Sequence, residues 1–299
     1  MDIRFQEFAT DEQSLAKIIY GNEPHLTTNQ GVVLSSKVRE ELCAFLDGYN
    51  QWVNIAEQPY YRIDAYFDHG AMSILEINAW FVDGWGTALN LARASGISID
   101  AEKLIFPNRF ALEATEYLPE LQLFLYELGA TGKWGNRILD DIDKELKTYV
   151  YGRIGTGNPM AIPHDGQRID NKLNLAEYCQ IWDGELVRLP KHYTSMNATW
   201  DDIPTNAVLK FCDKSSEQCK QARRSVLIGK PSGKAPFLRK CFEEGQLIAQ
   251  DFVQPMVHES TNCQLVILAI GNSPITGYVQ YSPSAIINDN SVHGPLMIK

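Results

Sequence analysis

Two strand-like segments joined by a short turn constrain the fold of this chain more than any other feature. Tyr60–Phe67 and Met72–Trp80 flank the turn residues 68–71. Polar and apolar residues alternate within both segments, which is typical of β-strands because successive side chains point to opposite faces. The sequence therefore predicts a β-hairpin.

Polar side chains of this hairpin are spaced so that they can share one face. Arg62 and Asp64 are two positions apart on the first strand, with Tyr66 beside them, and Glu76 and Asn78 are two positions apart on the second. Such oxygen ligands suit Mg²⁺, which proteins usually hold through one or two carboxylates together with substrate phosphates. A structural ion pair between Arg62 and a carboxylate is the alternative. Asn78 favours the metal site, because asparagine is a poor strand former and packing does not require it there.

The metal-site hypothesis imposes a condition on the hairpin. The four polar groups share a face only if the loop has an odd number of residues, for instance three with Gly70 in a left-handed conformation, or if a β-bulge interrupts a strand. Leu75 and Ile77 are expected to point away from Glu76 and Asn78. A two-residue turn would place the two polar pairs on opposite faces.

The composition is that of an ordinary globular protein. The chain has 299 residues, of which 44% are hydrophobic and 21% are charged. This length predicts one large domain or two to three closely joined lobes. The formal net charge of -10 argues against nucleic acid as a partner, because nucleic-acid-binding surfaces are basic.

The sequence also indicates a cellular compartment. It has no run of about 18 apolar residues that could span a membrane, so no membrane partner is expected. The segment Met1–Glu7 lacks the basic and apolar regions of a secretory signal. The six cysteines show no CxxC spacing, which favours free thiols in a reducing environment. We therefore expect a cytoplasmic protein.

Helical and extended patterns are mixed along the chain. Helices are expected at 36–47, 87–95, 111–128, 136–150, 172–181, 216–224 and 235–244, and further strands at 206–211, 247–253, 263–271 and 277–281. Ser36 and Asp170 are expected to cap helices, and Gly96 and Gly245 to end them. The apolar face of the helix at 36–47 is expected to consist of Val38, Leu42, Phe45 and Leu46. Residues 152–167, rich in Gly and Pro, are the best candidate for a lobe boundary. The regular βα alternation of a doubly wound sheet is missing, so an α+β or multi-lobed α/β architecture is predicted.

Two glycine-rich segments do not qualify as phosphate-binding motifs. In Gly229–Ala235 only three residues separate the glycines, and Ala235 stands where a P-loop has Ser or Thr. Gly152–Gly157 has the wrong spacing for a dinucleotide fingerprint and is followed by Asn-Pro. The histidines are dispersed without HExxH spacing.

Two polar residues interrupt or end apolar strands. Lys210 ends an apolar strand, where a solvated lysine is the usual explanation. Gln250 lies inside the apolar run Leu247–Val253, and a buried amide needs hydrogen-bond partners. An adenine edge would supply them, and a position at a sheet edge would explain the residue equally well.

In this order, the motifs resemble a circularly permuted ATP-grasp ligase, most closely the synthetase domain of glutathionylspermidine and trypanothione synthases. That family has an R-x-D strand before an E-x-N strand at the same spacing, and Arg62, Asp64, Glu76 and Asn78 match it position by position. The resemblance implies two α+β lobes that clasp a nucleotide. It also implies that Asp64, Glu76 and Asn78 hold Mg²⁺, with Arg62 as a catalytic residue against the transferred phosphate or the acyl phosphate.

Further segments extend the resemblance to the nucleotide. Lys172 and Lys210 resemble the two lysines of the family, and Gln250, Asp251 and Phe252 resemble its adenine-binding strand. The segment Ile286–Ser291 resembles the last strand and turn of the family. The resemblance therefore implies that Lys172, Lys210, Gln250, Asp251 and Phe252 bind ATP.

The chain also departs from the family. The glycine-rich phosphate loop of the family is replaced in this chain by Phe211–Glu217. Ser215 and Ser216 are therefore expected to donate hydrogen bonds to phosphate in place of the glycine backbone. Gln280, a further candidate for the substrate site, stands where the family has an arginine that would contact the phosphate or the acyl group. The serines that would bind glutathione are missing after Asn78, and Phe81, Asp83 and Trp85 become candidates for a substrate pocket, with core packing as the alternative for the two aromatic residues.

These observations predict an ATP- and magnesium-dependent carboxylate–amine ligase that forms an amide through an acyl phosphate. Its partners would be small-molecule or peptide carboxylates and amines other than glutathione. A phosphotransferase and a non-catalytic ATP-binding assembly factor are the alternatives. The expected division is an N-terminal segment 1–45, a metal-binding and helical part 46–155, a nucleotide-clasping lobe 156–255 and C-terminal strands 256–299.

Overall fold

The structure is a computed structural model with a mixed α+β architecture. It describes residues 1–11, 19–20, 23–24, 26–55, 59–79, 84–99, 169–213, 216–223, 225–284, 287 and 291–299. The helices predicted at 111–128 and 136–150 and the boundary predicted at 152–167 lie outside these residues.

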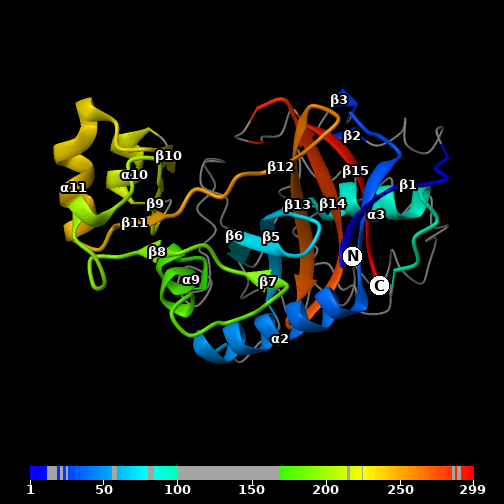
Figure 1. Cartoon of the computed structure of the whole chain (residues 1–299), viewed down its shortest axis with the longest axis horizontal. Coiled ribbons are helices and arrows are strands. Elements are labelled where there is room, and N and C mark those ends of the chain that lie inside the picture. The colour runs from blue at the N-terminus through cyan, green and yellow to red at the C-terminus, as the bar shows by residue number, and fades with distance from the viewer. Residues whose placement is uncertain are drawn as a thin grey trace, which may run out of the picture.

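A large mixed sheet forms the main body of the described part (Figure 1). Its order is β1-β4-β15-β14-β13-β5-β6-β7, with β12 paired to β13. Its strands are β1 (Ile3–Glu7), β4 (Gln30–Leu34), β5 (Tyr60–Phe67), β6 (Met72–Ala79), β7 (Val187–Arg188), β12 (Met256–His258), β13 (Thr261–Ile270), β14 (Ser273–Ser282) and β15 (Val292–Ile298). Most neighbours are antiparallel, whereas β15 pairs with β4 and β6 with β7 in parallel.

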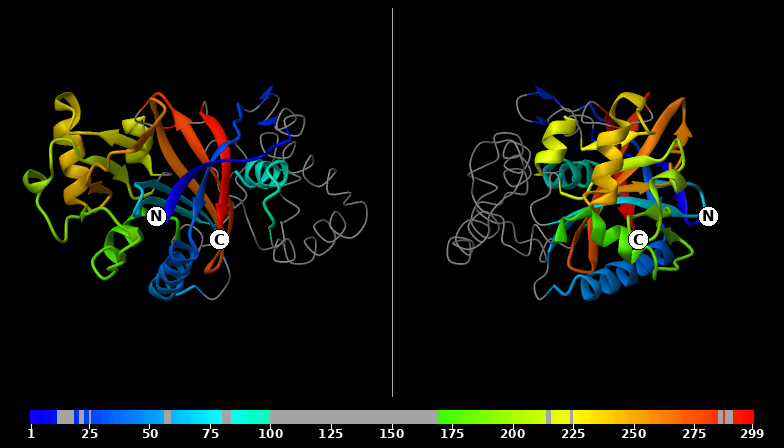
Figure 2. Two further views of the ribbon diagram at one scale, coloured as in Figure 1. Left: turned by 45° about the vertical axis from the view of Figure 1, so that its right-hand side comes forward. Right: turned by 90° about the vertical axis from the view of Figure 1, so that its left-hand side faces the viewer.

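A second, smaller unit contains an antiparallel sheet in the order β10-β9-β11-β8. We call it the small lobe. It consists of β8 (His192–Tyr193), η2 (Trp200–Asp202), β9 (Val208–Phe211), α10 (Glu217–Ala222), β10 (Val226–Ile228), η3 (Ser232–Lys234), α11 (Ala235–Glu243) and β11 (Leu247–Gln250). Figures 1 and 2 show it at one end of the large sheet, joined to β12 by the extended segment 251–255. A separate short pair is formed by β2 (Ile19–Tyr20) and β3 (Glu23–Pro24).

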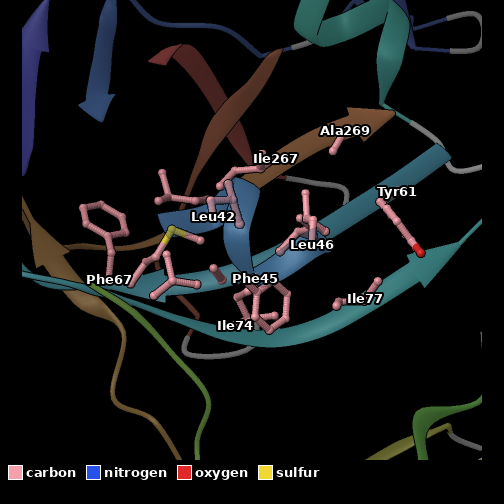
Figure 3. Close-up of a cluster of buried hydrophobic side chains, with 14 of the residues drawn as sticks. Leu42, Phe45, Leu46, Tyr61, Phe67, Ile74, Ile77, Ile267 and Ala269 are labelled. Atoms are coloured by element: carbon pink, nitrogen blue, oxygen red, sulfur yellow. The ribbon is translucent and has the colours of Figure 1, made fainter. Parts of the chain in front are cut away.

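Helix α2 (Ser36–Trp52) covers one face of the large sheet and buries its apolar stripe there. Leu42, Phe45 and Leu46 of α2 meet Ile77 and Ile267 of the sheet in one cluster (Figure 3). The predicted apolar face of this helix is therefore confirmed. The N-cap is Ser35, not the predicted Ser36, because Ser35 is extended and its Oγ accepts the Val38 amide at 3.4 Å.

Helix α9 (Lys172–Tyr178) precedes β7 in the sequence, and β7 pairs with β6 in the large sheet. Its N-cap is Asn171, whose Oδ1 accepts the Leu173 amide at 2.9 Å, so the prediction of Asp170 was wrong. Asp170 instead accepts a hydrogen bond from the Ala79 amide at 3.2 Å, which ties the start of α9 to the end of β6.

Helix α3 (Trp85–Ala94) packs against β14 and β15. It begins at Trp85, two residues before the predicted start. Gly84 caps it with φ +96°, and a Cβ at this position would lie 2.7 Å from the Tyr278 hydroxyl. Both observations require glycine, which accommodates a positive φ and close approach. The predicted stop at Gly96, with φ +63°, is confirmed.

The predicted strand 247–253 is regular only to Gln250, because the chain then leaves the small sheet for the large one. The strands that were not predicted are β1, β2, β3, β4, β7, β8, β10, β12 and β15. None of the helices in the described ranges is long and apolar enough to cross a bilayer.

Candidate functional site

A cleft of about 240 Å³ opens between the β5–β6 hairpin and the small lobe. This is slightly below the range of about 300–1,000 Å³ that is usual for small-molecule sites. Its walls come from both sheets and the segment between them. They consist of Arg62, Asp64, Tyr66, Leu75, Glu76, Val208, Lys210, Val226, Ile228, Gln250, Asp251, Phe252, Val253, Gln264, Gln280 and Ile287.

The register of the hairpin meets the condition that the sequence imposed. Arg62 lies opposite Asn78, and Asp64 lies opposite Glu76, so the four polar groups share a face. A β-bulge at Leu75 makes this possible, because Asp64 pairs with Glu76 while the next residue, Ala65, pairs with Ile74. The alternative of a left-handed Gly70 was wrong, since Gly70 is not among the positive-φ glycines.

The bulge also corrects the expected orientation of Leu75. Ile74 and Ile77 both lie in the core against α2, whereas Leu75 lines the cleft beside Glu76. The Leu75 carbonyl oxygen accepts hydrogen bonds from Lys210 Nζ at 2.6 Å and Gln250 Nε2 at 3.4 Å. The extra residue thus gives the small lobe a contact point on the hairpin.

Asp64 is held by donors from three strands. Arg62 Nε donates to its Oδ1 at 3.0 Å, and both side chains are about 15% exposed or less. Asn78 Nδ2 lies 3.4 Å from Oδ2, and Gln264 Nε2 of β13 lies 3.3 Å from Oδ1. The Arg62–Asp64 ion pair considered at the sequence level is therefore present, and the carboxylate is fixed in orientation on the cleft wall.

Lys172 contacts Glu76 and Asn78 but does not line the cleft itself. Its Nζ is 3.0 Å from Glu76 Oε1, 3.1 Å from Asn78 Oδ1 and 3.0 Å from the Ile77 carbonyl oxygen. It is also 3.3 Å from Asp170 Oδ1. The side chain is buried, so the ammonium is an internal partner of two predicted metal ligands.

A row of buried polar side chains continues from Asp64 across the large sheet. Gln264 Nε2 lies 3.4 Å from Gln280 Oε1, and Gln280 Nε2 lies 3.3 Å from His293 Nε2. Gln280 thus lines the cleft where the family would have an arginine, but its amide takes part in this row.

Tyr66 also lines the cleft, beside Asp64. Burial and the neighbouring Asp64 raise the pKa of Tyr66 to about 12, so its hydroxyl stays protonated.

The small-lobe wall is mostly apolar. Val226 lies opposite Lys210 and Ile228 opposite Val208, and Ile228 is 46% exposed toward the cleft it lines. Gln250 lies opposite Val208 on one side and opposite His192 on the other. Burial, together with Lys210, lowers the pKa of His192 to about 3, so this imidazole is neutral.

The segment 251–255, which connects the two sheets, also contributes to the cleft wall. The Asp251 amide donates to the Lys191 carbonyl oxygen at 2.9 Å, and Tyr193 Oη lies 3.0 Å from Asp251 Oδ1. Phe252 and Val253 follow and line the cleft. This part of the site is anchored to the small lobe, which fixes the turn from β11 toward β12.

Most predicted site residues come together at this cleft. Those that line it are Arg62, Asp64, Glu76, Lys210, Gln250, Asp251, Phe252 and Gln280, and Asn78 and Lys172 adjoin them. Ser216 does not line it, because its Oγ caps α10 by accepting the Cys219 amide. Ser215, Phe81, Asp83 and the Trp85 side chain lie outside the described part.

Several residues of the site were missed. Gln264 and the apolar pair Val226 and Ile228 have clear places in the cleft walls. Gln264 has the same signal as Gln250, a glutamine inside an apolar strand, and could have been found in the same way. No sequence signal identifies the Leu75 carbonyl oxygen.

Within the described residues, no three His, Cys, Asp or Glu side chains form a metal-binding group. No protein-family model matches the chain, and no curated protein is significantly similar to it. The resemblance to the glutathionylspermidine synthases therefore stays a prediction.

Proposed function

We propose that this protein is an ATP- and magnesium-dependent carboxylate–amine ligase with an ATP-grasp-like arrangement of its two sheets. The composition of the cleft between the two sheets is the main observation that supports this proposal. One wall presents Asp64 and Glu76 from adjacent strands, and the other presents Lys210 and Gln250 beside apolar side chains. A nucleotide has a polyanionic end and a flat aromatic end, which match these two walls.

The types of residue on the hairpin support a magnesium ion as part of this proposal. Asp64 and Glu76 are directly opposite on neighbouring antiparallel strands, where Cβ atoms lie about 4.5–5.5 Å apart. Two carboxylates with the Asn78 carboxamide form a hard-oxygen donor set that leaves positions for water and phosphate oxygens. Gln264 would orient Asp64 from outside the ligand shell. When bound, the ion would neutralise phosphate charge and polarise the transferred group.

The small lobe supports binding of the nucleotide itself. Lys210 Nζ already reaches across the cleft to the Leu75 carbonyl oxygen, and could exchange this partner for a phosphate oxygen. The partly exposed Ile228 and Val226 provide an apolar surface for a base. Gln250 and the segment that includes Phe252 border that surface and offer polar groups for its edge.

The reaction would depend mainly on positioning and charge neutralisation. A substrate carboxylate would attack the γ-phosphate to give an acyl phosphate and ADP. An amine would then displace phosphate and form the amide. Arg62, oriented by Asp64 on the hairpin wall of the cleft, would stabilise the transferred phosphate. The six cysteines, all in the described ranges, form no disulfide, which supports a reducing compartment, namely the cytoplasm.

Replacement of Glu76 tests the metal assignment. In Glu76→Ala, magnesium-dependent ATP hydrolysis should be lost while the circular dichroism spectrum stays that of the wild type. Near-normal turnover in this variant would refute the assignment. Exposed Glu217 is the matched control, and Glu217→Ala should retain activity because the residue lies on α10 outside the cleft lining.

The chemistry can be tested with hydroxylamine and a panel of carboxylates. An acyl phosphate is trapped as a hydroxamate, so ADP and hydroxamate should appear in equal amounts. ADP together with a phosphorylated hydroxyl compound would identify a phosphotransferase instead.

A second candidate is an ATP-binding assembly factor without catalysis. Gln280, an uncharged side chain hydrogen-bonded into the amide row, favours it, because it supplies no positive charge to the cleft. Tight binding of magnesium-ATP without turnover, across a broad screen of amino acids and polyamines, would support this candidate over the ligase.

A further inference from the structure

Lys172 has an environment that differs from that of the other cleft lysine. Its ammonium contacts a carboxylate, a carboxamide and a main-chain carbonyl oxygen on consecutive residues of β6, and a second carboxylate on Asp170. An ammonium has three N–H donors, so these partners account for all of them. Lys210, by contrast, reaches the hairpin through the Leu75 carbonyl oxygen.

These contacts place a positive charge on two of the three predicted metal ligands. Glu76 Oε1 and Asn78 Oδ1 face the ammonium at 3.0 and 3.1 Å. The local group contains three carboxylates, those of Asp64, Glu76 and Asp170, and two cations, Arg62 and Lys172, which leaves a single net negative charge. A divalent ion arriving alone would meet a nearly neutralised site.

We propose that Lys172 is a resident counter-cation that holds the position of a metal ion at Glu76 and Asn78. Free divalent metal then binds weakly, and the ion enters mainly as its nucleotide complex, whose phosphates bring the missing negative charge. This inference rests on the proposed metal ligands. It gives Lys172 a role different from the direct nucleotide contact that the family resemblance implies.

The burial of Lys172 supports this role. The residue is 5% exposed at the first turn of α9, and the main-chain amide of Lys172 is bonded to the Cys212 carbonyl oxygen at 3.0 Å. The helix start is further fixed by Asp170 on the Ala79 amide. The position of the ammonium is therefore fixed by the fold, unlike that of a lysine side chain on the surface.

Binding of Mn²⁺ without nucleotide tests the proposal, with free Mn²⁺ measured by electron paramagnetic resonance. Lys172→Gln removes the charge but keeps a hydrogen-bond donor for Glu76. Its Mn²⁺ affinity should be at least tenfold higher than that of the wild type. Lys172→Arg keeps the charge and should bind Mn²⁺ as weakly as the wild type.

Lys210→Gln is the matched control, because it removes a second cleft lysine that also contacts a β6 carbonyl oxygen. Equal Mn²⁺ affinity in wild type and Lys172→Gln would overturn the proposal, and so would an equal rise in both glutamine variants. If Lys172→Gln unfolds at the assay temperature, Mn²⁺ should raise its melting temperature more than that of the wild type. Equal rises would contradict the proposal.

The proposed function is tested separately by the binding of magnesium-ATP to the wild type. Absence of that binding would reject the ligase while the Mn²⁺ comparison still decides the role of Lys172. Normal nucleotide binding with unchanged Mn²⁺ affinity would reject only the counter-cation.

Discussion

The two walls of the cleft come from different sheets, one mixed and one antiparallel, and they differ in how many charged side chains they present. The hairpin of the large sheet presents Arg62, Asp64 and Glu76, while the small sheet presents Val208, Val226 and Ile228. Each sheet buries its other face under its own helices, α2 for the large sheet and α11 for the small one. Apolar packing therefore holds each lobe together, and the two cleft faces match the proposed nucleotide, which has one charged and one apolar end.

Removal of a charge from the large-sheet wall should have the largest effect. Asp64→Asn keeps the shape of the side chain but removes the negative charge, so magnesium-dependent nucleotide affinity should fall by more than about 100-fold, because residues outside a ligand shell already account for 10–100-fold. Isothermal titration with magnesium-ATP measures it. Asp47→Asn on α2 is a control that should bind normally, and wild-type affinity in Asp64→Asn would show that this wall holds no metal.

The second-largest effect is expected in the pH dependence of stability, through the buried imidazole of His192 in the small sheet. The pKa of His192 is depressed to about 3, so the unfolded chain takes up a proton below about pH 6.5 that the folded chain does not. The buried, neutral imidazole therefore makes its full contribution to stability above that pH, and the free energy of unfolding decreases as the pH falls below it. Between pH 7 and pH 5, the free energy of unfolding should drop by about 2 kcal/mol more in the wild type than in His192→Gln. Urea denaturation at both pH values measures the drop, and equal drops would contradict the assigned burial of the imidazole.

The smallest effect is expected from the apolar wall. Ile228→Ser removes part of the surface proposed for the base, and since the side chain is only partly buried, nucleotide affinity should fall by about tenfold. Mn²⁺ binding without nucleotide should not change. A parallel loss of both affinities would mean that the two walls do not act separately. Val257→Ser, an exposed position on β12, is a control that should bind nucleotide as the wild type does.

The local elements were predictable where a residue pattern repeats within a short window. The hairpin, the apolar face of α2 and the stops at Gly96 and Gly245 follow from periodicity and from glycine's tolerance of positive φ. The caps were each predicted one residue away from the observed Ser35 and Asn171. Adjacent polar residues can each act as the N-cap, and which of them does so depends on its backbone conformation, which the residue type alone does not reveal.

Long-range pairings were not predictable in the same way. Strands β4 and β15 pair in parallel although more than 250 residues separate them. The residue pattern of either strand does not indicate which strand it will pair with. Lys172 is a comparable case, because its contacts join α9 to β6 across a wide gap in the chain. Local periodicity carries no information on such contacts.

By itself, the sequence determined which residues could form an oxygen-rich, charged surface and on which strands they would lie, because side chains alternate along a strand. Only the tertiary structure decided that Asp64 and Glu76 face each other, since the bulge at Leu75 changes the phase of β6. It also decided that Lys210 and Gln250 meet that hairpin across a cleft, because docking of the small lobe depends on how the whole chain folds.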